Sequence, residues 1–306
     1  MNERYLKITE KLKKNELIIH DGAIGTELQK RGIEMDGSWC GTASLQDNIL
    51  KQVHTDYIHA GSQIITTNTY ASSRIMLKSA GFEKRFEEVN LKAVDSALKA
   101  REETGYKDVI VAGSISHRYP IADGDTKSNA SIQVSKLELQ DATEEMALLL
   151  TNNGCDVILL EMMYRPERMK IIFNIVKKLN IPIWVCFSCR ESDKGEILSL
   201  TDETVVPFSE MIEISKEYNF DGWGIMHTSE NILGECIKMI KTNLNGPILA
   251  YPDTGGWISP NWIFDTVIEP EKFKEKAKGW FELGAQIIGG CCGTSPDHIR
   301  ALSTLK

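Results

Sequence analysis

Residues 136–161 read KLELQDATEEMALLLTNNGCDVILLE, a helix-length amphipathic stretch followed by a glycine and a short apolar run. The spacing predicts a helix over Lys136–Asn153, and Gly154 stands where a left-handed residue commonly follows a helix end. The run Val157–Leu160 is apolar throughout rather than alternating, which is typical of a strand covered on both faces in a parallel sheet. The stretch therefore predicts one helix–strand unit of an α/β protein.

This unit recurs along the chain. Eight apolar runs are predicted strands: Leu17–His20, Gln63–Thr66, Val109–Ala112, Val157–Leu160, Ile183–Phe187, Gly222–Met226, Ile248–Tyr251 and Gln286–Ile288. The other predicted helices are Gln46–Ala60, Lys84–Glu103, Arg165–Leu179, Pro207–Tyr218 and Asn231–Thr242, and Gly61 and Gly284 are further predicted helix ends. Eight such units in 306 residues predict a TIM (β/α)8 barrel that forms a single domain over residues 1–306. An open doubly wound sheet is the alternative fold.

Composition and charge exclude several classes of protein. Hydrophobic residues make up 42% and charged residues 25%, which is typical of a globular chain with a full core. The net charge of −8 does not favour nucleic acid or an anionic membrane as partner. No apolar run reaches the ~18 residues of a membrane span, and the charged N-terminal segment lacks an apolar signal core, so we expect a cytoplasmic protein. The seven cysteines, an odd number, favour free thiols, metal binding or catalysis over a disulfide framework.

Polar or metal-binding residue types follow the predicted strands. In a TIM barrel the carboxyl ends of the strands form the active site. In this chain those positions are Asp21, Asn68, Ser114, Glu161, Ser188, His227, Asp253 and the pair Cys291–Cys292. Loops are polar in any protein, but two adjacent cysteines and a histidine at one barrel mouth are less ordinary.

The run Gly289-Gly290-Cys291-Cys292-Gly293-Thr294 is the sharpest motif. Adjacent strand side chains point to opposite faces, so both cysteines can bind one ion only where the backbone leaves β geometry, which glycines permit. Two thiolates suit Zn²⁺, and a catalytic zinc site has three protein ligands and one open position. His227 is the candidate third ligand. The alternatives are two buried cysteines in a tight turn and a loop histidine without a metal.

A family resemblance rests on several segments of the chain. They are DGAIGTEL at 21–28, AGSQIITTNTY at 60–70, AGS at 112–114, DVILLE at 156–161, Tyr251-Pro252, and Gly284 to Pro296 with its GGCCGT run. On these the chain resembles, nearly end to end, the homocysteine S-methyltransferase family of zinc-dependent thiol methyltransferases. The family includes betaine–homocysteine and S-methylmethionine–homocysteine enzymes. The resemblance implies a TIM barrel and a zinc site with three cysteine ligands.

The chain departs from the family pattern at the metal. The family has an Asn-Cys pair after the sixth strand, where this chain has Met226 and His227. The resemblance therefore implies Cys291 and Cys292 as ligands, and His227 by position only. Either the site is a Cys₂His zinc site or metal binding is weakened. A neutral imidazole in place of a thiolate also makes the site less negative, so it should acidify a bound thiol more and leave the thiolate less nucleophilic.

The resemblance also suggests which residues contact the two substrates. Glu161 resembles the residue that holds the amino group of the amino-acid substrate, with Asp21 as a second acid and the backbone N–H groups of Gly22 and Ala23 for its carboxylate. Trp39 and Tyr70 resemble aromatic residues near the methyl donor, whose positive charge favours aromatic faces. Asn68 and Ser114 complete the predicted substrate-binding residues, and Trp257 lies in a candidate lid. Each also has a purely structural interpretation as a turn, ion-pair or core residue.

These observations predict a zinc-dependent transfer of a methyl group from a small sulfonium or quaternary ammonium donor to the thiol of homocysteine, giving methionine. S-methylmethionine, S-adenosylmethionine, betaine and dimethylsulfoniopropionate all remain open as donor, and so does the oligomeric state. One alternative is a metal-poor relative that binds an onium ligand or methylates another thiol. Another is a barrel enzyme that binds phosphate near Gly289–Gly290, which leaves both cysteines unexplained.

Overall fold

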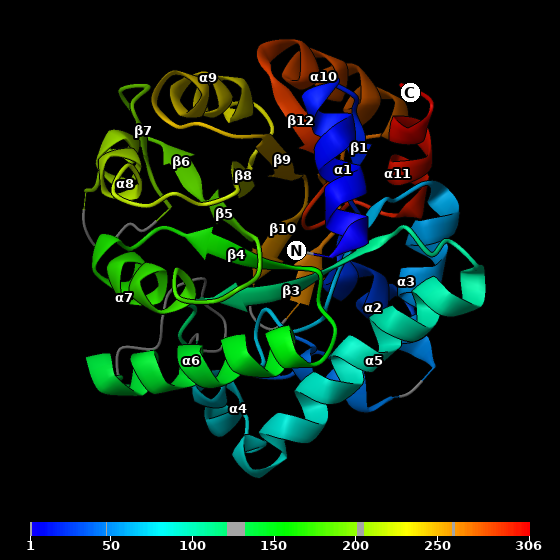
Figure 1. Cartoon of the computed structure of the whole chain (residues 1–306), viewed down its shortest axis with the longest axis vertical. Coiled ribbons are helices and arrows are strands. Elements are labelled where there is room, and N and C mark those ends of the chain that lie inside the picture. Colours follow the sequence, from blue (N-terminus) through cyan, green and yellow to red (C-terminus); the bar gives the residue numbers. More distant parts are fainter. Residues whose placement is uncertain (1, 47, 121–131, 201–204, 259–260) are drawn as a thin grey trace.

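Eight parallel strands form the centre of the molecule in the computed structural model, which describes residues 2–46, 48–120, 132–200, 205–258 and 261–306 (Figure 1). They are β1 (Ile18–Ile19), β2 (Ile64–Thr66), β3 (Ile110–Ser116), β4 (Val157–Met163), β5 (Ile183–Phe187), β8 (Gly222–Ser229), β9 (Ile248–Asp253) and β12 (Ala285–Ile288). Their order in the sheet is β1-β12-β9-β8-β5-β4-β3-β2, and a parallel bridge between His20 and Ile64 joins the two edges. The predicted TIM barrel is therefore confirmed, and the open sheet is wrong.

Helices surround the barrel and follow most strands (Figure 1). They are α3 (Ile49–Ala60), α5 (Phe86–Thr104), α6 (Lys136–Asn152), α7 (Pro166–Val176), α8 (Phe208–Ser215), α9 (Leu233–Asn243), α10 (Pro270–Leu283) and α11 (Pro296–Ser303). The six predicted helices are all present, with ends that differ by a few residues. Helix α6 begins with a capping box in which Ser135 and Glu138 satisfy each other's backbone N–H groups. Gly61 and Gly284 end α3 and α10 with positive φ, as predicted.

The remaining elements are an N-terminal helix, α1, and several short segments between the units. They are α1 (Glu3–Lys13), α2 (Ile24–Lys30), η1 (Gly41–Leu45), α4 (Arg74–Ser79), η2 (Glu83–Arg85) and the hairpins β6–β7 (Cys189–Glu191, Ile197–Ser199) and β10–β11 (Gly256–Ile258, Asn261–Ile263). The sequence did not predict them. Trp257, the candidate lid residue, belongs to β10, but its side chain lies outside the described part of the structure.

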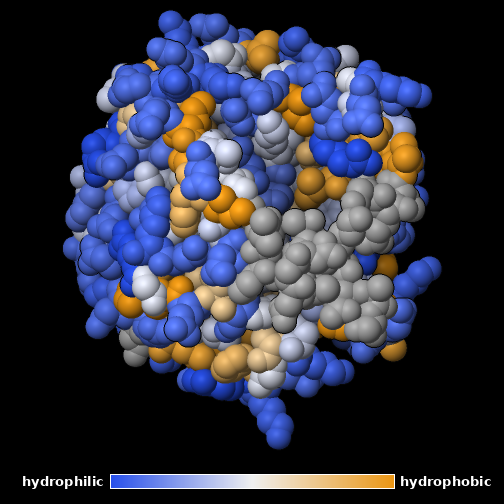
Figure 2. All heavy atoms as spheres, turned by 180° about the vertical axis from the view of Figure 1, so that it is seen from behind, coloured by the Kyte–Doolittle hydropathy of each residue, from blue (hydrophilic) through white to orange (hydrophobic). Residues whose placement is uncertain are grey.

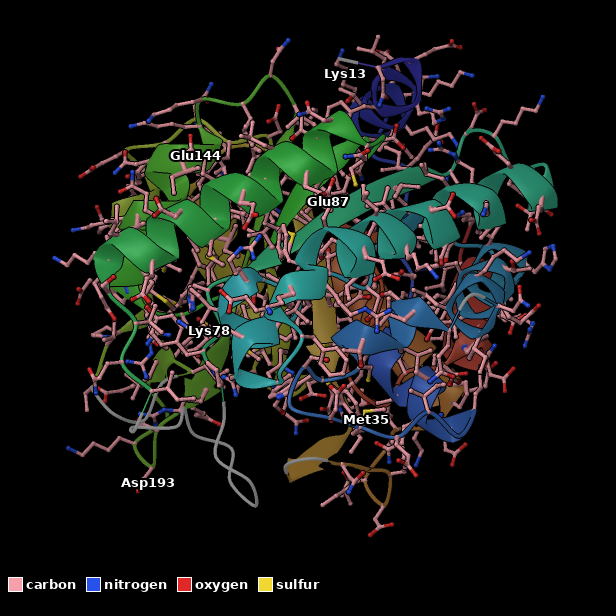
Figure 3. The ribbon with its side chains drawn as sticks, turned by 90° about the horizontal axis from the view of Figure 1, so that it is seen from below. Lys13, Met35, Lys78, Glu87, Glu144 and Asp193 are labelled. Carbon is pink, nitrogen blue, oxygen red and sulfur yellow. The ribbon has the colours of Figure 1, made fainter. Side chains whose placement is uncertain are left out.

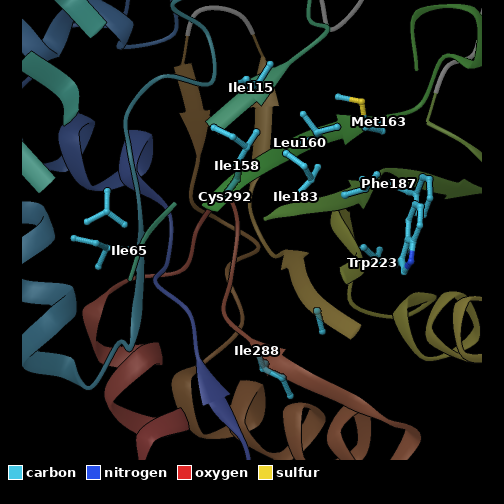
Figure 4. Packing of buried hydrophobic residues seen from close by; sticks show 14 of the residues in the cluster. Ile65, Ile115, Ile158, Leu160, Met163, Ile183, Phe187, Trp223, Ile288 and Cys292 are labelled. Atoms are coloured by element: carbon cyan, nitrogen blue, oxygen red, sulfur yellow. The ribbon is translucent and has the colours of Figure 1, made fainter. Parts of the chain in front are cut away.

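Strand residues alternate between two hydrophobic clusters. Ile19, Ile65, Val111, Ile158 and Leu160 belong to the larger cluster between barrel and helices, part of which is shown in Figure 4. Their neighbours along the strands fill the barrel interior: Ile18, Ile64, Ile110, Ala112, Val157 and Leu159. Both clusters consist of buried hydrophobic residues, so burial on both strand faces explains the continuous apolar runs in the sequence.

Helix α1 supplies two residues, Tyr5 and Ile8, to the interior cluster. The Tyr5 ring lies 5.9 Å from the ring of Trp184, the second residue of β5. The interior is therefore covered at the amino ends of the strands, and the opposite end is left for a site.

The outer surface is mainly hydrophilic (Figure 2), and charged side chains such as Lys78 on α4, Glu87 on α5 and Glu144 on α6 lie on it (Figure 3). In the described part of the chain, no helix has the length and apolar character that crossing a membrane requires.

Candidate metal centre and substrate pocket

Two strands bend at their carboxyl ends where they reach the barrel mouth. Met162 on β4 and His227 on β8 have positive φ values of 50° and 42°, and the pairing register shifts at each place. Such a bulge breaks the alternation of side chains. As a result Glu161 and Met162 both line one pocket, and so do Met226 and His227. The predicted strands end at Leu160 and Met226, and the structure shows that β4 and β8 each continue three residues further, to Met163 and Ser229.

The cysteine pair lies just after β12, where glycines bring the backbone into close contact with its neighbours. A Cβ atom on Gly289 would lie 2.4 Å from the Asp21 carbonyl oxygen, and one on Gly290 would lie 2.3 Å from a Thr294 methyl carbon. The Cys291 N–H donates to the Pro252 carbonyl at 2.7 Å, which ties the turn to β9. This departure from strand geometry places Cys291 and Cys292 on one wall of the pocket, as the sequence predicted.

Three possible metal ligands meet at this wall. The Nδ1 atom of His227 lies 3.7 Å from the Cys291 sulfur and 3.6 Å from the Cys292 sulfur, and the two sulfurs are 3.8 Å apart. A tetrahedral zinc ion with Zn–S near 2.3 Å and Zn–N near 2.0–2.1 Å separates two sulfurs by about 3.8 Å and a sulfur and a nitrogen by about 3.6 Å. The donor set and its spacing therefore fit zinc. They form the one group of three or more His, Cys, Asp or Glu residues in the described chain whose ligand atoms all lie close together.

Burial and mutual charge set the protonation of this group. The hydrogen bond from Cys291 lowers the pKa of the Cys292 thiol well below its usual value, and His227 lowers it further. Burial acts to lower the pKa of His227, but the negative charges of Asp253 and Cys292 outweigh it and raise that pKa to about 9. Both shifts favour a thiolate at Cys292 and a protonated imidazole at His227. Metal binding requires the imidazole to lose that proton.

Aromatic rings form another part of the pocket. The Trp39 ring lies 5.9 Å from Tyr70 and 6.4 Å, edge on, from Trp262 of the β10–β11 hairpin. All three line the same cavity as His227 and the cysteine pair. Two sulfur-containing side chains, Met162 and Met226, also line it. Aromatic walls suit a methylated cation, and the Trp39 ring already has one cation, the Arg118 guanidinium, 4.9 Å from its centre.

The remaining predicted substrate residues divide into two groups. Trp39, Asn68, Tyr70, Glu161 and Ala23 line the pocket. The Asn68 amide donates a hydrogen bond to the Cys40 carbonyl at 2.7 Å, and the Ala23 N–H donates one to the Thr294 hydroxyl at 3.2 Å. Burial raises the pKa of Glu161 to about 8, and the nearby Ser114 side chain acts against this shift.

Asp21, Gly22 and Ser114 do not line the pocket. The Asp21 carboxylate is fully buried and accepts hydrogen bonds from the Thr66 N–H at 2.7 Å and the Tyr251 hydroxyl at 2.8 Å. These bonds use both of its oxygens to join β1, β2 and β9. The structure thus places the Asp21 carboxylate behind Tyr251, which lines the pocket, and a contact of Asp21 with substrate stays a prediction.

The sequence did not predict three of the residues that line the pocket: Met162, Met226 and Trp262. Trp262 stands five residues after Trp257 in an aromatic segment, but nothing in that segment says which ring enters the pocket. The methionines end apolar runs and are indistinguishable there from core residues. Asp253 was noted at a strand end, but its partner could not be read from the sequence.

Comparisons with known proteins identify the family and the fold of the chain. The family model described as homocysteine S-methyltransferase matches residues 18–305. Homocysteine S-methyltransferase 1 of Arabidopsis thaliana is 26% identical, with 92% of this chain and 91% of the relative covered. Homocysteine S-methyltransferase YbgG of Bacillus subtilis is 27% identical over 94% of this chain and 93% of its own. The metallated form of the homocysteine methyltransferase MmuM from Escherichia coli has a TM-score of 0.79 at 22% identity and covers 98% and 99% of the two chains.

Proposed function

The chain belongs to the homocysteine S-methyltransferase family, and from this premise we propose that it transfers a methyl group from a small onium compound to the thiol of homocysteine, with zinc at the barrel mouth. The observation that carries the proposal is the meeting of His227, Cys291 and Cys292 at tetrahedral zinc spacing on the wall of a pocket with aromatic sides. The names of the relatives support homocysteine as acceptor.

The thiol is the first substrate to account for. A free thiol has a pKa near 8.5, so little of it is the nucleophilic thiolate at neutral pH. Bound zinc would lower the pKa of a thiol at its open position. His227, Cys291 and Cys292 would hold the ion by three bonds. The three residues line the same cavity as Glu161 and Tyr251, so a substrate in that cavity would lie next to the ion.

Glu161 is suited to the amino group of the acceptor. Its side chain lines the pocket, and its carboxyl is nearly buried, with 8% of the residue exposed. Burial raises its pKa to about 8, which disfavours the charged form in the empty pocket. An ammonium group placed beside it would offset that cost and favour the carboxylate. The pair would then orient the amino acid with its thiol toward the cysteines.

Trp39, Tyr70 and Trp262 would hold the donor. Their faces attract an onium group without a formal countercharge. In the reaction the sulfur–methyl bond forms as the bond from methyl to the onium sulfur or nitrogen breaks, and the leaving group departs neutral with that electron pair. A negative and a positive charge are consumed together. An apolar pocket therefore favours the transition state more than water does.

A donor screen tests the proposal. Purified protein with its zinc is incubated with homocysteine and, separately, S-methylmethionine, S-adenosylmethionine, betaine or dimethylsulfoniopropionate, and methionine is measured by mass spectrometry. We expect methionine from at least one donor, and none from that donor with the Cys291→Ser, Cys292→Ser double variant. Turnover that is equal in the double variant, or no turnover by zinc-loaded protein with any methyl-onium compound, overturns it.

A further inference from the structure

The carboxylate of Asp253 lies on the same side of His227 as the two sulfurs. Its Oδ2 atom is 3.3 Å from His227 Nδ1, the nitrogen that also faces Cys291 and Cys292. A carboxylate that only orients a metal-binding histidine contacts the other ring nitrogen. Asp253 instead stands beside the nitrogen that the metal would take. Its side chain is 19% exposed, and His227 is its sole ion-pair partner within the described residues.

The backbone fixes Asp253 relative to the cysteines. The N–H groups of Thr254 and Gly255 both donate to the Cys292 carbonyl at 3.0 Å, and the Gly255 N–H also lies 3.3 Å from Asp253 Oδ1. A Cβ atom on Gly255 would come within 3.2 Å of the Gly293 nitrogen, so this close approach depends on glycine. The end of β9 is therefore docked on the cysteine turn, and the carboxylate is held where it faces the metal group.

The position of Asp253 affects the net charge of the metal site. Zn²⁺ with two thiolates and a neutral imidazole has no net charge, whereas a third anionic group makes the site singly negative. Asp253 is the carboxylate in contact with the group. Its oxygen lies beside the imidazole, and Asp253 does not belong to the three residues whose ligand atoms all lie within 4.8 Å of one another.

We propose that Asp253 is part of the metal centre, where its carboxylate supplies the third negative charge beside His227 and so retains the ion. This inference rests on the proposed zinc site. It adds a residue to that site and explains how a histidine can stand among its ligands: the negative charge that His227 lacks is provided by the neighbouring strand.

Zinc affinity in a double-mutant cycle tests the inference. Dissociation constants are measured by competition with a chromophoric chelator for the wild type, Asp253→Asn, His227→Cys and the double variant. Asn keeps the size and the Oδ1 acceptor of Asp253 and removes only the charge. We expect Asp253→Asn to weaken zinc binding about tenfold or more in the wild-type background. In the His227→Cys background, where a thiolate supplies the charge, we expect less than about a twofold effect.

The controls separate the possible failures. Asp193 is exposed on the surface (Figure 3), so Asp193→Asn should not change the affinity for zinc. The midpoint of thermal unfolding of each variant in excess chelator reports whether the protein without metal still folds. Equal weakening by Asp253→Asn in both backgrounds shows a merely structural role and overturns the inference, as does no weakening in the wild type. Failure of the wild type itself to bind zinc overturns the proposed function as well.

Discussion

Gly289 and Gly290 allow two adjacent cysteines to face one pocket, because any side chain at either position would collide with Asp21 or Thr294. This constraint was readable from the sequence, since glycines on both sides of the pair indicate a backbone that leaves strand geometry. The role of His227 was harder to read. Its place in the pocket depends on a positive φ of 42° at a bulge, which no sequence rule assigns to histidine.

Removing one sulfur should remove the metal. In Cys291→Ser or Cys292→Ser we expect less than about a tenth of the wild-type zinc per chain after dialysis, because zinc binds thiolate far better than hydroxyl. Methyl transfer should fall at least about 100-fold. Cys155→Ala, a buried cysteine away from the pocket, is the matched control. Elemental analysis and the methionine assay read the result, and full zinc content in either Ser variant would contradict it.

The aromatic wall makes a separable prediction. Trp39→Leu removes the ring beside Tyr70 and Trp262, whereas Trp39→Phe keeps an aromatic face. A cation–π contact contributes roughly 0.5–2 kcal/mol, so we expect Trp39→Leu to raise the KM for the donor about 3- to 30-fold. Trp39→Phe should raise it less, and neither should change zinc content. Steady-state kinetics at saturating homocysteine measure this, and equal donor KM values in both variants would rule out the ring as donor contact.

At the level of elements, one buried carboxylate joins three other segments of the chain. Asp156, just before β4, accepts from Arg101 of α5 at 2.8 Å, from the Val111 N–H of β3 at 2.9 Å and from Asn2, the N-cap of α1, at 2.5 Å. Its side chain is 1% exposed and that of Arg101 is 6% exposed. A buried pair that loses one partner leaves an uncompensated charge, which is costly.

Asp156→Ala should therefore lower the free energy of unfolding by about 3–5 kcal/mol. Asp108→Ala, which breaks an exposed ion pair with Lys7, should change it little. Urea unfolding followed by circular dichroism compares the two variants. A similar small effect at both positions would show that Asp156 does not hold these elements together.

Helix α3 contains a source of acid instability. His54 is fully buried, neither ring nitrogen has a hydrogen-bond partner within the described residues, and burial lowers its pKa to about 3. Its unfolded pKa is near 6.5, so the unfolded chain binds the proton more tightly. Above pH 6.5 the ring is neutral in both states and there is no penalty. As pH falls from 6.5 toward 3, the unfolded state gains protons first and the fold loses stability.

His54→Leu should remove this component. At pH 5 the protonation penalty of one such histidine is about 2 kcal/mol, and at pH 7.5 it is absent. The difference in free energy of unfolding between His54→Leu and the wild type should therefore be about 2 kcal/mol more favourable to the variant at pH 5 than at pH 7.5. Denaturant unfolding at the two pH values gives the difference. His59→Leu, on the same helix and exposed, is the control. An identical pH dependence of the wild type and His54→Leu would contradict the assignment.

No range was predicted for helices α10 and α11. The eight strands followed from the sequence because strands buried on both faces are continuously apolar, as β4 and β5 are. The short elements did not. Strands β6, β7, β10 and β11 have three residues each, too few for a periodic pattern, and α1 is polar enough on its outer face to resemble a charged terminal segment. Yet α1 provides Tyr5 and Ile8 to the barrel interior, and β11 contains Trp262, whose side chain lines the pocket.

For the whole molecule, two features matter most to function. The bridge from His20 to Ile64 closes the barrel, so the carboxyl ends of all strands surround one opening. Helix α1 covers the interior at the opposite end. Substrates and metal therefore share one pocket, whose walls come from both halves of the chain, from Ala23 to Cys292. The barrel was predictable from the number of strand–helix units. Whether a given side chain at a strand end lines the pocket depended on local bulges, which the sequence does not reveal.

X-ray absorption at the zinc edge, on purified protein with and without homocysteine, tests the central claim most directly. The account predicts about one zinc per chain bound by two sulfurs near 2.3 Å together with nitrogen or oxygen neighbours, and a third sulfur once homocysteine is added. A sulfur count that stays at two with saturating homocysteine, or zinc bound without sulfur, would contradict it.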